Sequence, residues 1–453
     1  MDLKNKRVLV AGTGISGIGA VGLLMHTDAD LILYDGNEKL SVAEIQSKLS
    51  GEKDIRIIIG ELDDAVIRTL DIAVLSPGIP TDAPFVNRMR DAGVFIWGEL
   101  ELADEFAKGT VLAITGTNGK TTTTTLVGEI LKNYFKEVFV VGNIGTAYTG
   151  VAMDTTESSY IVAETSSFQL ETVDEFHPKV SAILNLTPDH LNRHHTMEGY
   201  VNAKKNIMMN QTTEDFVILN YDDPLTKAIG ETAAPQVIYF SGTQVLENGY
   251  YFADEKIFCS ENGKAEEICS AGDLKILGLH NMENIMAAVA MARCVNVPMD
   301  TIRKTITAFT GVEHRIEFVT EKRGVAYYND SKGTNPDAAI KAIQAMVRPT
   351  LLIGGGYDKD STYDEWIEAF DGKVRYLVLL GATADKIEAC ARRHGFENII
   401  RTESLEEAVR VCGEKAQKGD AVLLSPACAS WGMFDNYEQR GRLFKEYVGK
   451  LEN

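Results

Sequence analysis

The sequence predicts an α/β protein of three domains, each built on a mainly parallel sheet. Short β-branched runs alternate with helical stretches, which is typical of βα units. Two glycine-rich loops each follow a predicted strand and precede a predicted helix. The chain of 453 residues is also too long for one ordinary core, since domains commonly have about 150 residues.

The predicted strands form two series separated by a segment of different character. Residues 236–276 contain short alternating strands and Asn-Gly turns, which predict a small antiparallel insert. A new βα series begins near Gly324 with VAYYND, and the chain ends in a helix rich in Glu, Arg and Lys. The other predicted strands are Arg7–Ala11, Leu31–Tyr34, Ile55–Ile59, Ile72–Ser76, Val111–Thr115, Val138–Val141, Tyr160–Glu164, Val180–Leu184, Phe216–Leu219, Thr350–Ile353, Tyr376–Leu380 and Ala421–Ser425.

Composition excludes several classes of function. The formal net charge of -20 argues against non-specific nucleic-acid binding, which depends on Lys and Arg neutralising phosphates. The N-terminal segment MDLKNKRVLVAG has no signal-peptide pattern, and no apolar run approaches the roughly 20 residues that span a bilayer. The six cysteines are scattered, without a CxxC pair or a His cluster at zinc spacing. We therefore expect a cytoplasmic monomer in a reducing compartment, without a membrane span.

The first glycine-rich loop is Gly12-Thr-Gly14-Ile-Ser16-Gly17, after the strand RVLVA. With Asp35 at the end of the next strand, it matches the dinucleotide-binding fingerprint. That match alone would indicate a nicotinamide or flavin enzyme. However, a helix N-terminus attracts any pyrophosphate, so a UDP-sugar would suit the same site. A tight βα turn without a ligand is the remaining interpretation.

The second loop is TGTNGKT, Thr115–Thr121, between the strand VLAIT and a predicted helix. Lys120 would reach the β- and γ-phosphates of a nucleotide, and the Thr121 hydroxyl would bind Mg²⁺. The loop is shorter than the usual P-loop pattern, because its first glycine comes late. One loop for a nucleotide-tagged substrate and another for ATP favour a ligase over a dehydrogenase.

The sequence resembles the Mur ligase family along all three predicted domains. In that family, GTNGKT is the ATP site. The resemblance implies a Rossmann-like UDP-substrate-binding domain (1–98), a P-loop ATPase-like ATP-binding domain with the antiparallel insert (99–311), and a Rossmann-like amino-acid-binding domain (312–453). It extends through AETSSFQLE, NLTPDHLNRH, YVNAKKNI, LGLHNMENIMAA, GVEHRIE, NDSKGTNPDA and SPACASWGMFDNYEQRG.

Within the family, three segments resemble the branch that adds D-glutamate. These are SSFQLE, SPACAS and Asp330-Ser-Lys-Gly-Thr-Asn335, where sister ligases carry a DxAH-type motif. The resemblance implies ATP-dependent ligation of D-glutamate to UDP-N-acetylmuramoyl-L-alanine through an acyl phosphate, giving ADP and phosphate in peptidoglycan precursor synthesis. Departures from the family pattern are Trp431, where a smaller aliphatic residue is usual, and GGGYDKD, in place of GGxDK.

The resemblance also implies roles for individual residues. Lys120, Glu164, His190 and Lys204 would be catalytic, with Thr121 and Glu164 holding one Mg²⁺. A second Mg²⁺ would use His190 and a carbamylated Lys204. Lys204 is preferred over the neighbouring Lys205 because its spacing from Tyr200 and Ile207 matches the family pattern. Taken without the family, Glu164 could be a helix cap or solvated acid and His190 a hydrogen-bonded core histidine. We assign no function to His194 and His195.

The remaining implied contacts fall into three groups. The ATP group is Gly116, Thr117, Asn118, Gly119, Lys120, Thr121, Thr122, Asn281, Asn284, Arg315 and Asp330. The UDP-substrate group is Gly14, Ser16, Asp35, Ser76, Gly78, Asn143 and Gln169. The D-glutamate group is Lys332, Thr334, Lys359, Ser430 and Tyr437.

Three rival hypotheses remain open. The first is a ligase of the same architecture that uses another amino acid, although NDSKGTN argues against it. A nicotinamide dehydrogenase would explain the first loop but leave Lys120, Glu164 and Lys204 without a role. A nucleotide-binding regulatory protein without catalysis would fit the same motifs. Because ATP and its clamps would come from different domains, we also expect large motion of residues 312–453 during a catalytic cycle.

Overall fold

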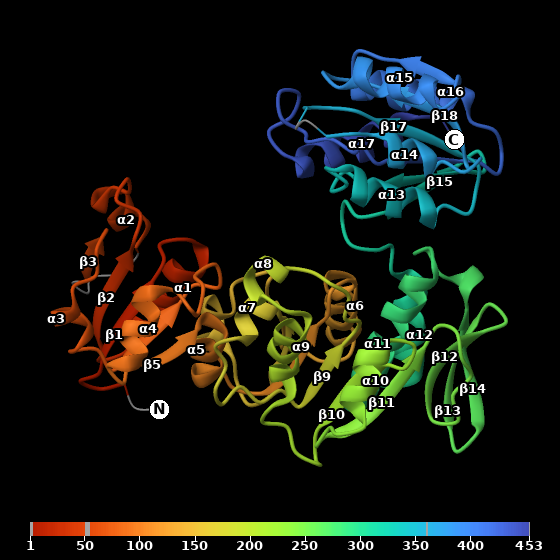
Figure 1. The fold of residues 1–453 in the computed structure, drawn as a ribbon. Coiled ribbons are helices and arrows are strands. Elements are labelled where there is room, and N and C mark those ends of the chain that lie inside the picture. Colours follow the sequence, from red (N-terminus) through yellow and green to blue (C-terminus); the bar gives the residue numbers. More distant parts are fainter. Residues whose placement is uncertain (1–2, 50–54, 359–360, 453) are drawn as a thin grey trace. The chain divides into compact units, whose positions relative to one another are not determined.

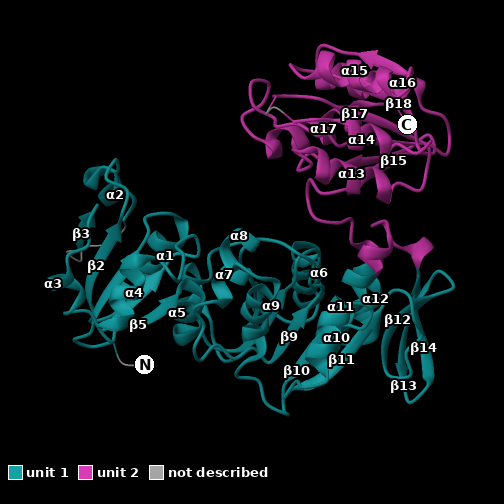
Figure 2. Ribbon diagram, viewed as in Figure 1, with its two compact units in different colours: residues 1–270, 283–306 teal, residues 271–282, 307–453 magenta. Residues whose placement is uncertain are grey.

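The computed structural model describes residues 3–49, 55–358 and 361–452 and confirms three α/β domains, each with its own sheet (Figure 1). The chain divides into two compact units (Figure 2). The first comprises residues 1–270 and 283–306, and it holds the first two sheets. The second comprises residues 271–282 and 307–453, and it holds the third sheet.

The first sheet has five parallel strands in the order β3-β2-β1-β4-β5. The strand order reverses at β1, so a ligand site is expected beyond the carboxyl ends of β1 and β4. Alternate residues of β1 enter separate hydrophobic clusters, because helices cover both sheet faces. The elements are β1 Arg7–Ala11, α1 Ile15–Leu24, β2 Asp30–Asp35, α2 Val42–Lys48, β3 Arg56–Ile59, α3 Asp64–Ile67, β4 Ile72–Leu75, α4 Pro84–Asp91, β5 Phe95–Gly98 and α5 Glu99–Phe106.

The central sheet has nine strands in the order β14-β13-β12-β11-β10-β9-β6-β8-β7. The P-loop connects β6, in its parallel part, to α6. The elements are β6 Thr110–Thr115, α6 Lys120–Lys132, β7 Val138–Gly142, η1 Tyr148–Gly150, η2 Ala152–Asp154, β8 Tyr160–Glu164, α7 Ser167–Leu170, β9 Val180–Ile183, α8 Leu191–His194, α9 Met197–Lys205, η3 Asn206–Met208, β10 Phe216–Asn220, α10 Pro224–Gly230, β11 Gln236–Ser241, β12 Gly249–Ala253, β13 Lys256–Glu261, β14 Lys264–Ser270, η4 Ala271–Asp273, α11 Leu279–Cys294 and α12 Met299–Ala308.

The antiparallel insert is smaller than the sequence suggested. β11 pairs in parallel with β10 and so extends the main sheet, whereas only β12, β13 and β14 pair antiparallel to one another. Asn262-Gly263 forms the predicted two-residue hairpin turn, with φ values of 51° and 73°. The other hairpin turns at Asp254-Glu255, with φ values of 48° and 56°, and not at the upstream Asn-Gly pair. That pair lies where β12 begins.

The third sheet has the strand order β15-β16-β20-β17-β18-β19, with β15 antiparallel and the others parallel. The carboxyl ends of β16, β17 and β20 meet at one sheet edge, where the predicted D-glutamate segments follow them. β15 and the three-residue β19 were not among the predicted strands. The elements are β15 Glu317–Lys322, β16 Val325–Asn329, α13 Pro336–Ala345, β17 Thr350–Gly354, α14 Asp364–Glu368, β18 Val374–Leu379, α15 Ala384–Arg393, β19 Ile399–Arg401, α16 Leu405–Lys415, β20 Ala421–Leu424 and α17 Tyr437–Lys450.

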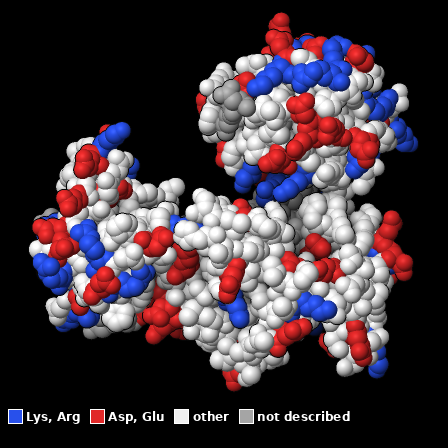
Figure 3. Space-filling view, in the orientation of Figure 1, with Lys and Arg blue, Asp and Glu red and all other residues white. Residues whose placement is uncertain are grey.

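Two sequence expectations concern the surface and the environment. Within the described ranges, no helix is both long enough and apolar enough to cross a bilayer. All six cysteines are unpaired. Basic and acidic side chains are interspersed on the face shown in Figure 3.

Candidate functional site

The first glycine loop is held closed by Asp35. Its Oδ2 atom accepts hydrogen bonds from the Thr13 amide at 3.0 Å and the Thr13 hydroxyl at 2.8 Å. A Cβ on Gly17 would lie 1.9 Å from the Gly12 carbonyl oxygen, so only glycine lets α1 approach the turn. Gly14, the N-cap of α1, has open space around its Cα. The amides that begin α1 therefore face room for an anionic group.

The loop Ser76-Pro77-Gly78, which follows β4, packs against this turn. The Ser76 hydroxyl is buried, makes no hydrogen bond in the described residues, and would contact a side chain at Gly12. Gly78 has open space around it. The structure thus places the Ser76 loop and the first glycine loop together at the switch point between β1 and β4, as the UDP-site prediction requires.

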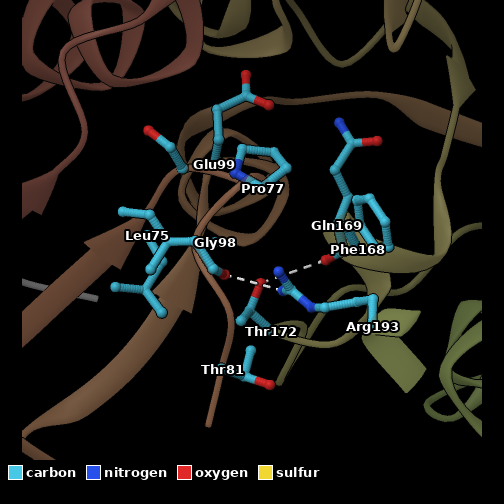
Figure 4. Close-up of a pocket in the computed structure, with 11 residues that line it drawn as sticks. Leu75, Pro77, Thr81, Gly98, Glu99, Phe168, Gln169, Thr172 and Arg193 are labelled. Atoms are coloured by element: carbon cyan, nitrogen blue, oxygen red, sulfur yellow. Dashed lines mark hydrogen bonds between the residues drawn. The ribbon is translucent and has the colours of Figure 1, made fainter. Parts of the chain in front are cut away.

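A narrow pocket lies between the first and central domains (Figure 4). Leu75 and Pro77 line it from the first domain, and Phe168, Gln169 and Arg193 from the central domain. The pocket therefore joins residues of both domains.

Arg193 crosses the junction between these two domains. It donates hydrogen bonds to Glu171 at 2.6 Å and to the Ile79 carbonyl at 2.8 Å. Gln169 uses its amide oxygen in the capping box of α7, where it accepts from the Ser166 amide. That cap leaves the Gln169 amide nitrogen as the group that could contact a substrate.

The P-loop is shaped by two glycines with positive φ. Gly116 and Gly119 have φ values of 150° and 85°, and a Cβ on Gly119 would lie 2.2 Å from Asn284 Oδ1. The Lys120 ammonium donates to the carbonyls of Gly116 at 2.8 Å and Thr117 at 2.9 Å. Lys120 therefore curls over the loop, where it would meet nucleotide phosphates.

The other predicted loop contacts surround that turn. The Thr117 hydroxyl donates to the Thr187 carbonyl and lies 2.9 Å from the Tyr200 hydroxyl. The Asn118 amide donates to Asn185 Oδ1 at 2.8 Å. Thr121 and Thr122 open the first turn of α6.

Glu164 is a buried carboxylate beside this loop. It is 1% exposed, and its Oε1 accepts from the Asn143 side-chain amide at 2.9 Å. Its Oε2 is buried without a hydrogen-bond partner in the described residues. A buried, unsatisfied carboxylate oxygen is costly, and a divalent cation would satisfy it. The donor set of Glu164 and the Thr121 hydroxyl suits Mg²⁺, which prefers oxygen ligands.

Lys204 is buried against the same loop, whereas its neighbour Lys205 is partly exposed. The Lys204 ammonium donates to the Gly116 carbonyl at 2.8 Å and the Thr115 hydroxyl at 3.2 Å. Burial, reinforced by the charge of Lys120, lowers the pKa of Lys204 to about 7. A neutral amine is therefore well populated near pH 7.

The first two histidines of NLTPDHLNRHH have different environments. His190 is half exposed, has a left-handed φ of 51°, and lies 3.5 Å from an Asp189 oxygen. No described hydrogen bond joins it to Glu164 or Lys204. His194 is buried between the Ser167 hydroxyl at 2.9 Å and a Glu171 oxygen at 3.1 Å. These contacts indicate a structural role.

The HNMEN helix meets the P-loop through Asn284. Asn284 Oδ1 accepts from the Thr123 hydroxyl at 3.3 Å, and the side chain is buried. Asn281 donates to the Leu277 carbonyl at 2.7 Å, one turn earlier. These contacts place Asn284 at the loop.

The predicted third-domain nucleotide clamp has one exposed and one buried member. Arg315 is exposed. Asp330 is 4% exposed and accepts from the Ser425 hydroxyl at 2.7 Å and the Ile316 amide at 3.2 Å. Burial raises the pKa of Asp330 to about 7. In this conformation Asp330 links the loops after β16 and β20.

The predicted D-glutamate residues lie on loops joined by a buried arginine. Arg440 is 2% exposed and donates to the Ser331 hydroxyl at 2.9 Å, the Ser331 carbonyl at 2.8 Å and the Cys428 carbonyl at 3.2 Å. The Ser331 hydroxyl in turn donates to the Tyr437 carbonyl at 2.8 Å. Arg440 therefore fixes the segments that carry the predicted ligands.

Four of the five predicted D-glutamate ligands fall on these segments. The Lys332 ammonium lies 5.9 Å from the ring centroid of Tyr437. Ser430 is 4% exposed, and its neighbour Trp431 is 53% exposed and packs against Tyr357. Thr334 follows Lys332 in the same loop. Lys359 lies outside the described residues.

Several site residues were not identified from the sequence. Arg440, Tyr200, Asp189 and Arg193 all lie inside the quoted motifs, but nothing in their spacing indicated their contacts.

Comparison with known proteins agrees with an architecture of three α/β domains, the first with a glycine loop and the second with a P-loop. Three family models match: Mur ligase MurD-like N-terminal domain over residues 6–98, Mur ligase middle domain over 114–292, and Mur ligase glutamate ligase domain over 314–428. The chain belongs to the Mur ligase family.

Relatives with full-length similarity share one description. The UDP-N-acetylmuramoylalanine–D-glutamate ligase of Lachnoclostridium phytofermentans is 55% identical over 453 residues, covering 100% of both chains. The ligase of the same name from Lachnospira eligens is 54% identical over 451 residues, again covering 100% of both. A third, from Clostridioides difficile, is 46% identical over 453 residues with the same coverage.

Solved structures share the fold at lower identity. UDP-N-acetylmuramate-alanine ligase MurC of Thermotoga maritima has a TM-score of 0.57 and 20% identity, covering 98% of this chain and 99% of that one. A MurF ligase of Thermotoga maritima in complex with ADP has a TM-score of 0.55 and 18% identity, covering 99% and 96%. These likenesses establish the Mur ligase fold.

Proposed function

We propose that this chain joins D-glutamate to UDP-N-acetylmuramoyl-L-alanine in peptidoglycan precursor synthesis, converting ATP to ADP and phosphate. The full-length identity of 55% to a ligase of that description supports the substrate assignment. The observation that carries the chemistry is the buried group beside the P-loop. There, Glu164 and Lys204 lie against the turn that positions Lys120.

The reaction must activate a carboxylate, because its oxygen is a poor leaving group. A carboxylate oxygen of the acceptor would attack the γ-phosphorus of ATP, and ADP would leave. The amine of D-glutamate would then attack the carbonyl carbon of this acyl phosphate. Phosphate leaves with the C–O bonding electrons, and the nitrogen loses a proton as the amide forms.

The chain's own groups supply charge stabilisation for the first step. Lys120 would leave its two loop carbonyls and neutralise charge on the γ-phosphate. Thr121 and Glu164 would hold Mg²⁺, which supplies charge neutralisation at the transferring phosphate when bound. The Asn143 amide, already bonded to Glu164, lies where it could orient the acceptor carboxylate.

Lys204 would act as a carbamate. Formation of the carbamate requires a neutral amine that attacks CO₂ and releases a proton, and the lowered pKa of about 7 makes that amine available. The product would be an anion in place of a cation. An anion there would attract a second Mg²⁺, together with His190, whereas the ammonium would repel it.

The domain assignment and cellular setting belong to the same proposal. Residues 1–98 would bind the UDP-substrate, 99–311 ATP, and 312–453 D-glutamate. The open N-terminus of α1 supports UDP-substrate binding by the first domain. The loops that Arg440 joins support D-glutamate binding by the third domain. Because ATP and a UDP-linked precursor are substrates, we place the reaction in the cytoplasm, carried out by a monomer.

The test is phosphate release from ATP with UDP-N-acetylmuramoyl-L-alanine and one amino acid at a time. D-Glutamate should support release, while L-glutamate, L-alanine, L-lysine and meso-diaminopimelate should not. Release with another amino acid alone would refute the assigned specificity. The matched control is Lys120→Ala, which should keep the fold and lose turnover; full turnover in this variant would refute the assigned site.

A further inference from the structure

The third domain carries a cluster of side chains of metal-ligating types, formed by Asp364, Cys390 and His394. Each offers one ligand atom, and these atoms all lie within 4.8 Å of one another. Bond lengths of about 2.0–2.3 Å to a tetrahedral zinc ion place ligand atoms roughly 3.2–3.8 Å apart. Small side-chain adjustments would therefore bring the three atoms around one ion.

Two helices build this cluster. Cys390 lies on α15, and His394 is the C-cap of that helix, so they are one turn apart on the same face. Asp364 is the first residue of α14. Cys390 and His394 are close in the sequence, whereas Asp364 belongs to another helix, so the complete cluster appears only in the fold.

The carboxylates around His394 define which nitrogen would bind. His394 Nε2 lies 2.9 Å from Asp364 Oδ1, and Nδ1 lies 3.7 Å from Glu368 Oε1. Metal-bound histidines commonly present their second nitrogen to a carboxylate, which fixes the ring. Glu368, one turn after Asp364 on α14, occupies that position.

The donor types select the ion. A thiol, an imidazole and a carboxylate together suit Zn²⁺ and similar divalent transition metals, whereas Mg²⁺ prefers oxygen ligands alone. Cys390 is 3% exposed within the apolar core of the domain, while Asp364 and His394 are open to solvent. The thiol thus closes the inner side of the site, and an ion would enter from the outer side.

We propose that Asp364, Cys390 and His394 bind one Zn²⁺-class ion, with Glu368 orienting His394. On binding, the Cys390 thiol releases its proton to solvent, and the ion replaces the hydrogen bond between Asp364 and His394. Water would complete the coordination. Arg393, which lies 3.4 Å from Asp364 and is 62% exposed, would turn outward. The ion would clamp α14 to α15.

The test uses Co²⁺ as a spectroscopic probe on the full-length protein, after chelator treatment and with excess Mg²⁺ to occupy oxygen sites. We expect one Co²⁺ per chain with a near-ultraviolet thiolate-to-cobalt charge-transfer band. Zn²⁺ should displace it. Cys390→Ser should abolish the band, and Cys412→Ser, which alters another buried cysteine of the same domain, should retain it.

Two solvent-facing variants keep the test independent of folding of the cysteine variant. His394→Gln and Asp364→Asn should each weaken Zn²⁺ binding at least about tenfold. Zn²⁺ should also raise the melting temperature of the wild-type protein but not that of His394→Gln. Absence of the band in the wild-type protein, or equal Zn²⁺ affinity in His394→Gln, would overturn the proposal and leave an ion pair between His394 and Asp364.

Discussion

Replacing Lys204 with methionine should stabilise the fold while abolishing turnover. The substitution removes a buried ammonium but keeps a chain of similar length that fills the same space. Loss of turnover is expected because Lys204 would no longer form a carbamate. The two effects have opposite signs, so a variant that is merely misfolded cannot produce both.

The size of the stability gain follows from the local contacts. A pKa of about 7 in the fold against 10.5 in the unfolded chain costs roughly 4 kcal/mol at pH 7. Against this, the variant loses two donated hydrogen bonds. The Gly116 carbonyl still accepts from Lys120, and the Thr115 hydroxyl still donates to the Thr165 carbonyl, so this loss is about 2 kcal/mol. The net gain is about 2 kcal/mol.

The pH dependence of this gain has a definite sign. The folded-state pKa of Lys204 is lowered, so the unfolded chain binds more protons between pH 7 and 10.5, and wild-type stability rises across that interval. The advantage of Lys204→Met is therefore full below pH 7 and shrinks as pH rises. Above pH 10.5 only the two lost hydrogen bonds remain, and the variant should be about 2 kcal/mol less stable than wild type.

The assay is urea unfolding at several pH values in CO₂-free buffer, so that Lys204 remains an amine. Lys205→Met is the matched control, and its stability should change by less than about 0.5 kcal/mol because that side chain is only partly buried. A Lys204→Met variant that is less stable than wild type at pH 7 would refute the desolvation argument.

Three further predictions concern the loops and the core. Gly17→Ala should destabilise the chain by about 3 kcal/mol in urea unfolding, because its Cβ would lie 1.9 Å from a backbone oxygen. Gly22→Ala in the same helix has open space and should be neutral or stabilising. Equal effects of the two substitutions would contradict the close-approach argument. Arg440→Lys should raise the KM for D-glutamate about tenfold in phosphate-release assays, since one ammonium cannot bridge the same carbonyl and hydroxyl oxygens. An unchanged KM would show that Arg440 does not position the D-glutamate site. Burial opposes ionisation of Asp215, but hydrogen bonds from neighbouring His, Thr and Lys side chains outweigh it and bring the pKa to about 2. About 2 kcal/mol of stability that is present above pH 3.8 should therefore be lost as pH falls toward 2. An acid-unfolding curve that is the same in Asp215→Asn would disprove this.

The strands and phosphate loops could be predicted because their signals are local. A buried parallel strand is a continuous apolar run, and a phosphate loop needs glycines at fixed positions, so β6 and the P-loop are visible within a dozen residues. The choice of Lys204 over Lys205 came from family spacing, and burial of Lys204 at the loop supports it.

Contacts between distant segments could not be predicted in the same way. Arg440 bonds to Ser331 across 109 positions, and no local pattern relates the two. The polar alternation of β15 resembles a surface segment, because only its pairing with β16 makes it a strand. The Asn-Gly pair before β12 carries a strong turn signal, yet the hairpin turn forms at Asp254-Glu255, because strand register decides between candidate turns.

The first glycine loop carries a motif that fits more than one nucleotide ligand. A dinucleotide site commonly uses the acidic residue after the second strand to bind ribose hydroxyls. In this chain Asp35 Oδ2 accepts two hydrogen bonds from Thr13, and Oδ1 accepts one from the Asn37 amide at 3.0 Å. Asp35 therefore holds the loop in this structure, while the open N-terminus of α1 keeps its capacity for a pyrophosphate. A nicotinamide dinucleotide and a UDP-sugar both contain a pyrophosphate and a ribose, so the loop alone does not separate them, and the full-length identity to D-glutamate ligases decides for the UDP-linked ligand.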